Sequence, residues 1–155
     1  MTITLERPVT TTDPLTLLDT EVADRLTLRI TTDHPDIDQA TARRIVGQTA
    51  AFVAASGQQP GQSLAPSRLV DIGWHTFILH TVDYTTFCEQ VVGRFVHHVP
   101  TTDGEEPPDN GETRQRTLAA ITAAGYTIDP ELWPDVADCS QCHAGCTDSP
   151  NSGTK

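Results

Sequence analysis

The segment from Val70 to Cys88 constrains the fold of this chain more than any other. It reads VDIGWHTFILHTVDYTTFC, and it gathers tryptophan, tyrosine and phenylalanine beside two histidines, one cysteine and two aspartates. A segment this apolar must bury much of its surface against other elements. Thr81 can begin a new helix, so we expect a pair of helices, over residues 66–79 and 82–93, rather than one long rod.

Capping residues and apolar spacing predict further helices on both sides of this pair. Asp13-Pro14 supplies an N-cap and a first helical position, and Asp36 can cap the next helix. Apolar residues follow both caps at steps of three and four, as in an amphipathic helix. The expected helices cover residues 14–30, 37–57 and 113–124, with a short helical turn from residue 130.

These elements predict an all-α fold. We expect a small single-domain helical bundle of four to five helices with an irregular C-terminal tail. A chain of 155 residues is long enough to bury one such core. The predicted organisation is a flexible N-terminus over residues 1–12, a helical domain over 13–134 and a Cys-rich, disordered tail over 135–155.

The charge of the chain limits its partners. The formal net charge is −11, and nine of the ten basic residues are arginines. This acidity argues against binding to nucleic acid or to an anionic membrane, both of which need a basic face. No apolar run approaches the roughly 20 residues of a spanning helix, and the N-terminal residues lack a signal-peptide pattern. We therefore expect a cytoplasmic protein whose cysteines are thiols or metal ligands.

Ligand-type side chains within and after the helix pair indicate a first candidate site. Asp71 and His75 are four residues apart and share one helix face. That spacing suits either two ligands to one metal or a carboxylate that orients an imidazole. Cys88 and one of His97 or His98 could fold back on this face. These three residue types together are typical of a zinc site.

A purely structural role for the same residues is the alternative. The helix is apolar enough to be mainly core, and Trp74 is expected to be buried against positions such as Phe52 or Leu118. His75 would then hydrogen-bond Asp71 or a backbone carbonyl as a buried polar group. A lone cysteine in a core is commonly inert.

The C-terminal cysteines form a second candidate site. Cys139, Cys142, His143 and Cys146 offer three thiolates and an imidazole, enough for one tetrahedral zinc. The Cys-x-x-Cys-His pattern is also that of c-type haem attachment, but haem is disfavoured because attachment occurs outside the cytoplasm and Met1 is the only methionine. A redox dithiol, a post-translationally modified peptide segment and incidental thiols remain open.

The helix-pair motif resembles the core motif of the glycine-rich-domain-containing (GRDP-like) proteins, whose function is unknown. This chain has Phe77 and Thr81 where that motif has a second histidine and a proline. The chain also resembles short actinobacterial proteins that carry Trp-His-x-Phe-Ile-Leu-His-Thr, a Gly-Arg-Phe-x-His-His-x-Pro stretch and a Cys-rich end. Neither resemblance implies an established activity. The residues shared with the GRDP-like motif are Asp71, Trp74, His75, Leu79, Tyr84 and Cys88.

Three functions follow from these patterns. The first is a small zinc-binding protein that acts as a binding or accessory module. The second is a precursor whose Cys-rich segment is modified, with a protein partner or a modifying enzyme acting on the tail. The third is a metal-dependent enzyme that uses Asp71, His75 and His97 or His98. The sequence contains no nucleophile elbow, phosphate-binding loop or His-Glu-x-x-His motif, so an enzyme is the least supported.

Overall fold

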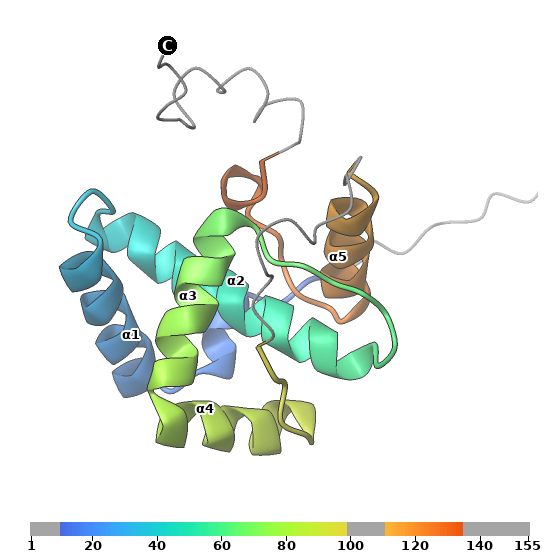
Figure 1. Cartoon of the computed structure of the whole chain (residues 1–155), viewed down its shortest axis with the longest axis horizontal. Coiled ribbons are helices and arrows are strands. Elements are labelled where there is room, and N and C mark those ends of the chain that lie inside the picture. Colours follow the sequence, from blue (N-terminus) through green and yellow to red (C-terminus); the bar gives the residue numbers. More distant parts are fainter. Residues whose placement is uncertain (1–9, 99–110, 135–155) are drawn as a thin grey trace, which may run out of the picture.

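A computed structural model of the chain describes residues 10–98 and 111–134. Within these residues the protein is all-α and has no strand, which confirms the predicted fold class (Figure 1). No helix in this part is long and apolar enough to cross a membrane. The elements are η1 (Pro14–Leu17), α1 (Thr20–Asp33), α2 (Gln39–Gln58), α3 (Arg68–Leu79), α4 (Thr81–Phe87), the π-helical turn η2 (Cys88–Val92), α5 (Glu112–Ala123) and η3 (Pro130–Leu132).

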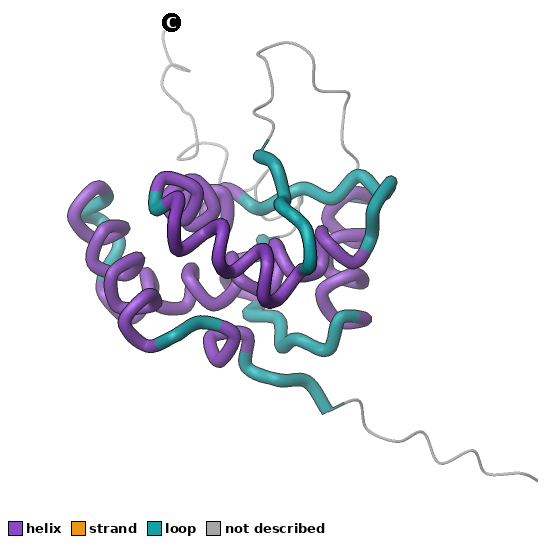
Figure 2. The backbone as a smooth tube through the Cα atoms, turned by 90° about the horizontal axis from the view of Figure 1, so that it is seen from below, coloured by secondary structure: helices purple, strands orange, loops and turns teal. Residues whose placement is uncertain are grey.

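Helix α2 is the centre of the molecule, and α1, α3, α5 and η1 all pack against it (Figures 1 and 2). Every residue from Ile45 to Ala55 is buried. The helix begins after Asp38, whose carboxylate accepts a hydrogen bond from the Thr41 N–H at 2.7 Å. The predicted cap at Asp36 was therefore wrong, because a turn closed by the Ile37 N–H on the His34 carbonyl at 2.9 Å occupies that place.

A glycine lets α3 cross α2 at close range. A Cβ atom on Gly73 would lie 2.1 Å from Thr49 Oγ1 and 2.8 Å from Ile45 Cγ2, which is far too close. The neighbouring Trp74 is 8 % exposed, and its ring meets that of Phe52 edge-on at 4.9 Å between centroids. The expectation that this tryptophan is buried against α2 is confirmed.

The helix expected over residues 14–30 is two elements. Asp13 caps η1 through a 3.0 Å hydrogen bond from the Leu15 N–H, but Leu18 is extended and α1 begins only at Thr20. This break places Leu15 on α2, where its Cβ lies 3.6 Å from the position that a side chain on Gly47 would take. A single continuous helix could not follow α2 in this way.

The predicted break between the motif helices is confirmed. Helix α3 ends at Leu79 and α4 begins at Thr81, with His80 outside the helical region at φ −87°, ψ 69°. The second helix passes into η2 and ends at Gly93, whose φ of +86° is readily adopted only by glycine. Residues 1–9 and 135–155, which include most of the predicted flexible N-terminus and the predicted disordered tail, lie outside the described residues.

Candidate functional site

Residues 94–98, which we call the strap, follow η2 and lie against α3 and α4. The hydroxyl of Tyr84 accepts a hydrogen bond from Trp74 Nε1 at 3.0 Å and donates one to the carbonyl oxygen of Val96. The ring of Phe95 meets that of Tyr84 edge-on at 5.2 Å. Burial raises the pKa of Tyr84 well above its usual value, so the phenol stays protonated and can donate its hydrogen bond to the Val96 carbonyl. The strap is therefore held at its centre by a buried donor.

The strap delivers His98 to the carboxylate of Asp71. His98 Nε2 lies 2.9 Å from Asp71 Oδ1, and the imidazole ring lies 4.5 Å from that of Trp74. The His98 side chain is 18 % exposed and that of Asp71 is 50 % exposed. In the neutral imidazole, a proton on Nε2 that is donated to the carboxylate leaves the lone pair on Nδ1. This arrangement makes His98 Nδ1 available as a ligand or a base.

His75 lies beside this pair but is not the hydrogen-bond partner of Asp71. Its exposed ring stands nearly perpendicular to that of His98, at 68° and 6.3 Å between centroids. The expected Asp71–His75 unit is therefore corrected: within the described residues, the carboxylate pairs with His98. The four-residue spacing of Asp71 and His75 favoured a pair on one helix face. The strap instead brings His98, which is 27 residues away in the sequence, into contact with the carboxylate.

The structure separates two of the other predicted ligands. Cys88 is completely buried in the core, whereas His97 is exposed and its ring lies 4.7 Å from that of Phe95. His97 and His98 thus point to opposite sides of the strap, as expected for an extended segment. The described residues contain no group of three or more His, Cys, Asp or Glu side chains already arranged to hold a metal ion. Metal binding by Asp71, His75 and His98 stays a prediction.

The four tail ligands lie beyond the described part of the chain, so no geometry is assigned to them. They are Cys139, Cys142, His143 and Cys146.

A groove of about 250 Å³ continues the site between the end of α1 and helix α3. His80 Nδ1 lies 2.9 Å from the Thr76 carbonyl oxygen, so Nδ1 carries the proton that is donated to it. In a neutral ring, Nε2 of His80 then carries the lone pair. The site predicted from the sequence included neither His34 nor His80. The shared groove could not be read locally, because α1 meets α3 only in the tertiary structure. The groove is lined by Arg29, Asp33, His34, Asp71, Ile72, His75, Thr76, Leu79 and His80.

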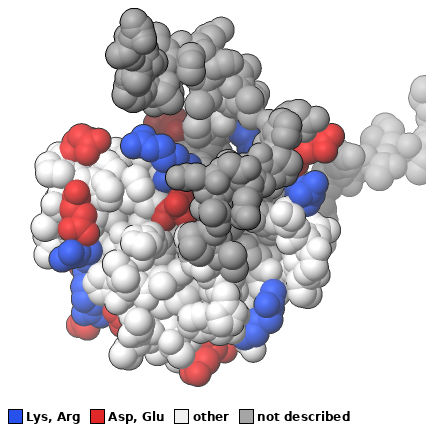
Figure 3. Space-filling view, in the orientation of Figure 1, with Lys and Arg blue, Asp and Glu red and all other residues white. Residues whose placement is uncertain are grey.

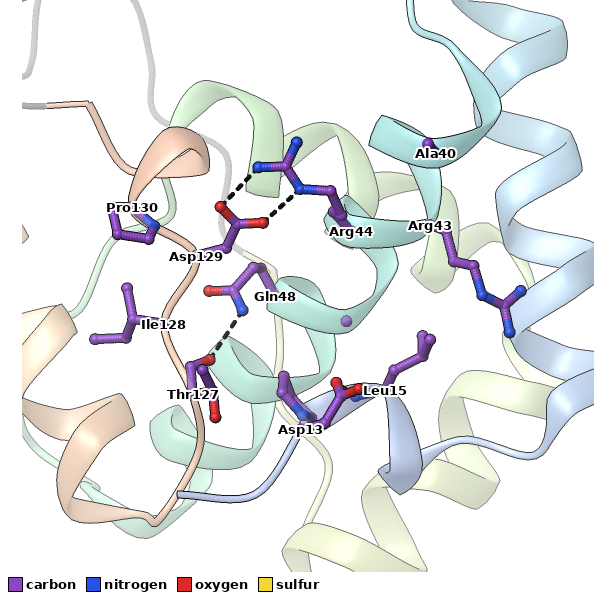
Figure 4. Close-up of a pocket in the computed structure, with 12 residues that line it drawn as sticks. Asp13, Leu15, Ala40, Arg43, Arg44, Gln48, Thr127, Ile128, Asp129 and Pro130 are labelled. Atoms are coloured by element: carbon purple, nitrogen blue, oxygen red, sulfur yellow. Dashed lines mark hydrogen bonds and ion pairs between the residues drawn. The ribbon is translucent and has the colours of Figure 1, made fainter. Parts of the chain in front are cut away.

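A larger pocket, of about 690 Å³, lies between α2, η1 and residues 127–130 (Figure 4). Arg44 closes one side of it through hydrogen bonds of 2.6 and 2.8 Å to Asp129 and one of 2.8 Å to Glu131. Those bonds hold the pKa of Asp129 below its usual value. Arg43 points away from the pocket and pairs with Asp24 at 2.7 Å. The guanidinium groups around this pocket are thus already neutralised by carboxylates.

Acidic and basic side chains also lie next to each other on the face shown in Figure 3. The pair of Arg29 and Asp33, at 2.9 Å, is one of several such contacts. The site on α3 is therefore marked by its clustered imidazoles, of which His98 is paired with Asp71.

Comparison with known proteins places the chain in a family. The profile of the UCP032817-like family matches residues 16–131, which is more than half of the 155 residues and includes the motif helices and the strap. No curated protein and no solved structure gives a match. The family description states no activity, and the resemblance to the GRDP-like motif stays a prediction. The chain belongs to the UCP032817-like family.

Proposed function

We propose that this protein is a small zinc-binding module that acts as a binding or accessory protein, and that His98 and His75 are ligands. The observation that carries the proposal is the 2.9 Å contact between His98 Nε2 and Asp71 Oδ1, with a second imidazole beside it. Metal-bound histidines commonly donate their other N–H to a carboxylate in this way. Asp71 would orient His98 rather than bind the ion.

The spacing of the two imidazoles is compatible with one shared ion. A zinc ion lies about 2.1 Å from a ligating nitrogen, so two rings on one tetrahedral ion have centroids roughly 5–6 Å apart. The present separation is 6.3 Å, and His75 is exposed and free to turn. His98 is already held by Trp74 and Asp71, so a shared ion requires His75 to turn toward it.

The donor types favour zinc over calcium or magnesium. Imidazole nitrogens suit zinc, copper, nickel and iron, whereas calcium and magnesium prefer oxygen ligands. A cytoplasmic location, as expected from the sequence, would keep the cysteines of the chain reduced and able to bind the same class of metal.

Zinc titration of the purified, chelator-stripped full chain tests the proposal. We expect His98→Ala to weaken zinc binding by 100-fold or more, and Asp71→Asn to weaken it by ~10–100-fold, the usual effect of removing an orienting carboxylate. His97→Ala is the matched control, because this exposed histidine is adjacent in sequence but points away from Asp71. Circular dichroism would verify that each variant keeps its helices. Equal zinc affinity of the wild-type chain and the His98→Ala variant would contradict the proposal.

A further inference from the structure

One of the two proposed zinc ligands lies on a segment without regular secondary structure. His98 follows Gly93, the end of η2, and residues 94–98 form neither helix nor strand. Such a segment has no ladder of backbone hydrogen bonds to fix its path, so its contacts with the helices must do so. His75, in contrast, is carried by α3. Both ligands are therefore in place only while the strap lies against the helices, a state that we call docked.

The first residue of the strap makes an exposed contact. Arg94 donates hydrogen bonds of 3.3 Å to the Gly57 carbonyl and 3.2 Å to the Ser56 carbonyl, at the C-terminal end of α2. Carbonyl groups in the last turn of a helix have no partner within it, and a nearby cation is favoured there. Arg94 is exposed, however, and solvent weakens contacts of this kind. This contact therefore adds little to the stability of the docked state.

Tyr84 makes the buried contact with the strap. Tyr84 is 1 % exposed and Val96 is 7 % exposed. The phenol accepts a hydrogen bond from Trp74 Nε1 at 3.0 Å and donates one to the Val96 carbonyl, two residues before His98. Without the hydroxyl, the docked strap would keep this carbonyl buried and unpaired, a penalty that release into water removes. The indole of Trp74 also packs on the His98 ring at 4.5 Å, so the indole and the phenol together hold the backbone and the ligand ring.

We propose that Tyr84 is a positioning residue for the zinc site, because its hydroxyl keeps the strap docked and so sets the zinc affinity without touching the ion. This inference rests on the proposed function. When the strap is released, His98 leaves Asp71, and of the two proposed ligands only His75 stays on α3. The apparent dissociation constant is the intrinsic constant divided by the docked fraction. By thermodynamic reciprocity, zinc that binds both imidazoles must favour the docked strap to the same extent.

Zinc titration of the chelator-stripped full chain and two variants tests the inference. Tyr84→Phe keeps the ring contacts with Phe77 and Phe95 and loses only the hydroxyl. We expect this variant to bind zinc about 5-fold more weakly or worse, which corresponds to a strap docked in roughly one fifth of the molecules or fewer. Ile121→Val is the matched control. Ile121 is completely buried in α5, so the variant loses core packing but none of the strap contacts, and it should bind zinc like the wild-type chain.

The NMR signals of the His98 ring report docking in the absence of metal. In the docked strap the nearby indole of Trp74 shifts these signals through its ring current. The spectrum of His98→Ala identifies them among the six histidines. In zinc-free Tyr84→Phe the signals should move toward the values of a free histidine, and saturating zinc should bring them to those of the zinc-bound wild-type chain. A loss of general stability would not produce this metal-dependent return, and Ile121→Val should not show it.

Other outcomes overturn the inference. Equal zinc affinities of the wild-type chain and Tyr84→Phe would do so and leave the proposed function intact, as would equal losses in Tyr84→Phe and Ile121→Val. Unchanged His98 signals in zinc-free Tyr84→Phe would also overturn it. If circular dichroism shows that Tyr84→Phe loses its helices, Phe95→Ala decides, because it removes the strap ring that packs on Tyr84. Weaker zinc binding by Phe95→Ala supports the inference, and unchanged binding overturns it. Failure of the wild-type chain to bind zinc would overturn the inference and the proposed function together.

Discussion

Helix α3 makes two kinds of contact on two of its faces. Toward α2 it packs mainly by shape, because Gly73 leaves room for Thr49 and Ile45. A long hydrogen bond of 3.4 Å from Thr49 Oγ1 to the Val70 carbonyl is added. Toward the strap it is held by directed contacts, in which Asp71 pairs with His98. Trp74 belongs to both faces, since its ring touches Phe52 of α2 and His98 of the strap. Close packing fixes where the helix lies, whereas the polar contacts fix where a reactive side chain lies.

Removing the side chain shared by the two faces should have the largest effect. We expect Trp74→Ala to lower the free energy of unfolding by ~3–5 kcal/mol, the range for truncating a large buried aromatic side chain. The variant loses the contact with Phe52 and the hydrogen bond to Tyr84. Urea denaturation followed by far-ultraviolet circular dichroism measures the change. A loss below about 1 kcal/mol would show that the two faces do not depend on this residue.

The shape-determined face can be tested with a pair of glycines. Gly73→Ala should cost ~1–3 kcal/mol, because its Cβ would overlap the Thr49 hydroxyl across the interface. Gly47→Ala is the matched control on α2, since its Cβ would meet Leu15 at an ordinary 3.6 Å. That variant should gain up to ~1 kcal/mol from helix propensity and from a less flexible unfolded chain. Thermal or urea unfolding of both variants measures the change in unfolding free energy. Changes of the same sign in the two variants would contradict the close-packing account.

The polar face depends on the phenol that holds the strap. Tyr84→Phe keeps the ring but leaves Trp74 Nε1 and the Val96 carbonyl without their partner. We expect a loss of ~1–3 kcal/mol in unfolding free energy, the cost of unsatisfied buried polar groups. NMR of the His98 ring should also report a change of environment. Tyr126→Phe is the control, because the Tyr126 hydroxyl has no hydrogen bond within the described residues. Identical unfolding curves for the two variants would mean that the strap is held by other contacts.

The partly exposed ion pair between Arg44 and Asp129 should contribute least to the unfolding free energy. Hydrogen bonds from Arg44 lower the pKa of Asp129, so this carboxylate stabilises the fold above its usual pKa of about 4. The contribution is lost as the pH falls through the lowered pKa of the folded state. Asp129→Asn should cost at most ~1 kcal/mol at pH 7, since solvent screens the pair, and the difference should shrink as the pH falls below about 4. Urea midpoints of both proteins across that pH range give the test, and a difference independent of pH would contradict it.

Part of the candidate site could be read from the sequence and part could not. Asp71, His75 and His98 were all candidates, because ligand-type residues stood out in and after an apolar helix pair. The pairing within the set was wrong, since spacing on one helix favoured His75. Cys88 also fitted a ligand pattern, yet it faces the core, where a small apolar side chain is equally suited.

The sequence by itself determined where most helices begin and end, including the break between α3 and α4 and the glycine end of η2. Caps, glycines and apolar spacing are local signals, because they act within a turn or two of the chain. Only the tertiary structure decided which histidine meets Asp71. The strap has no helical period of its own, and its path depends on Tyr84 and Trp74, which are brought together by the turn at His80. Contacts between residues 27 apart are set by packing, for which no local pattern exists.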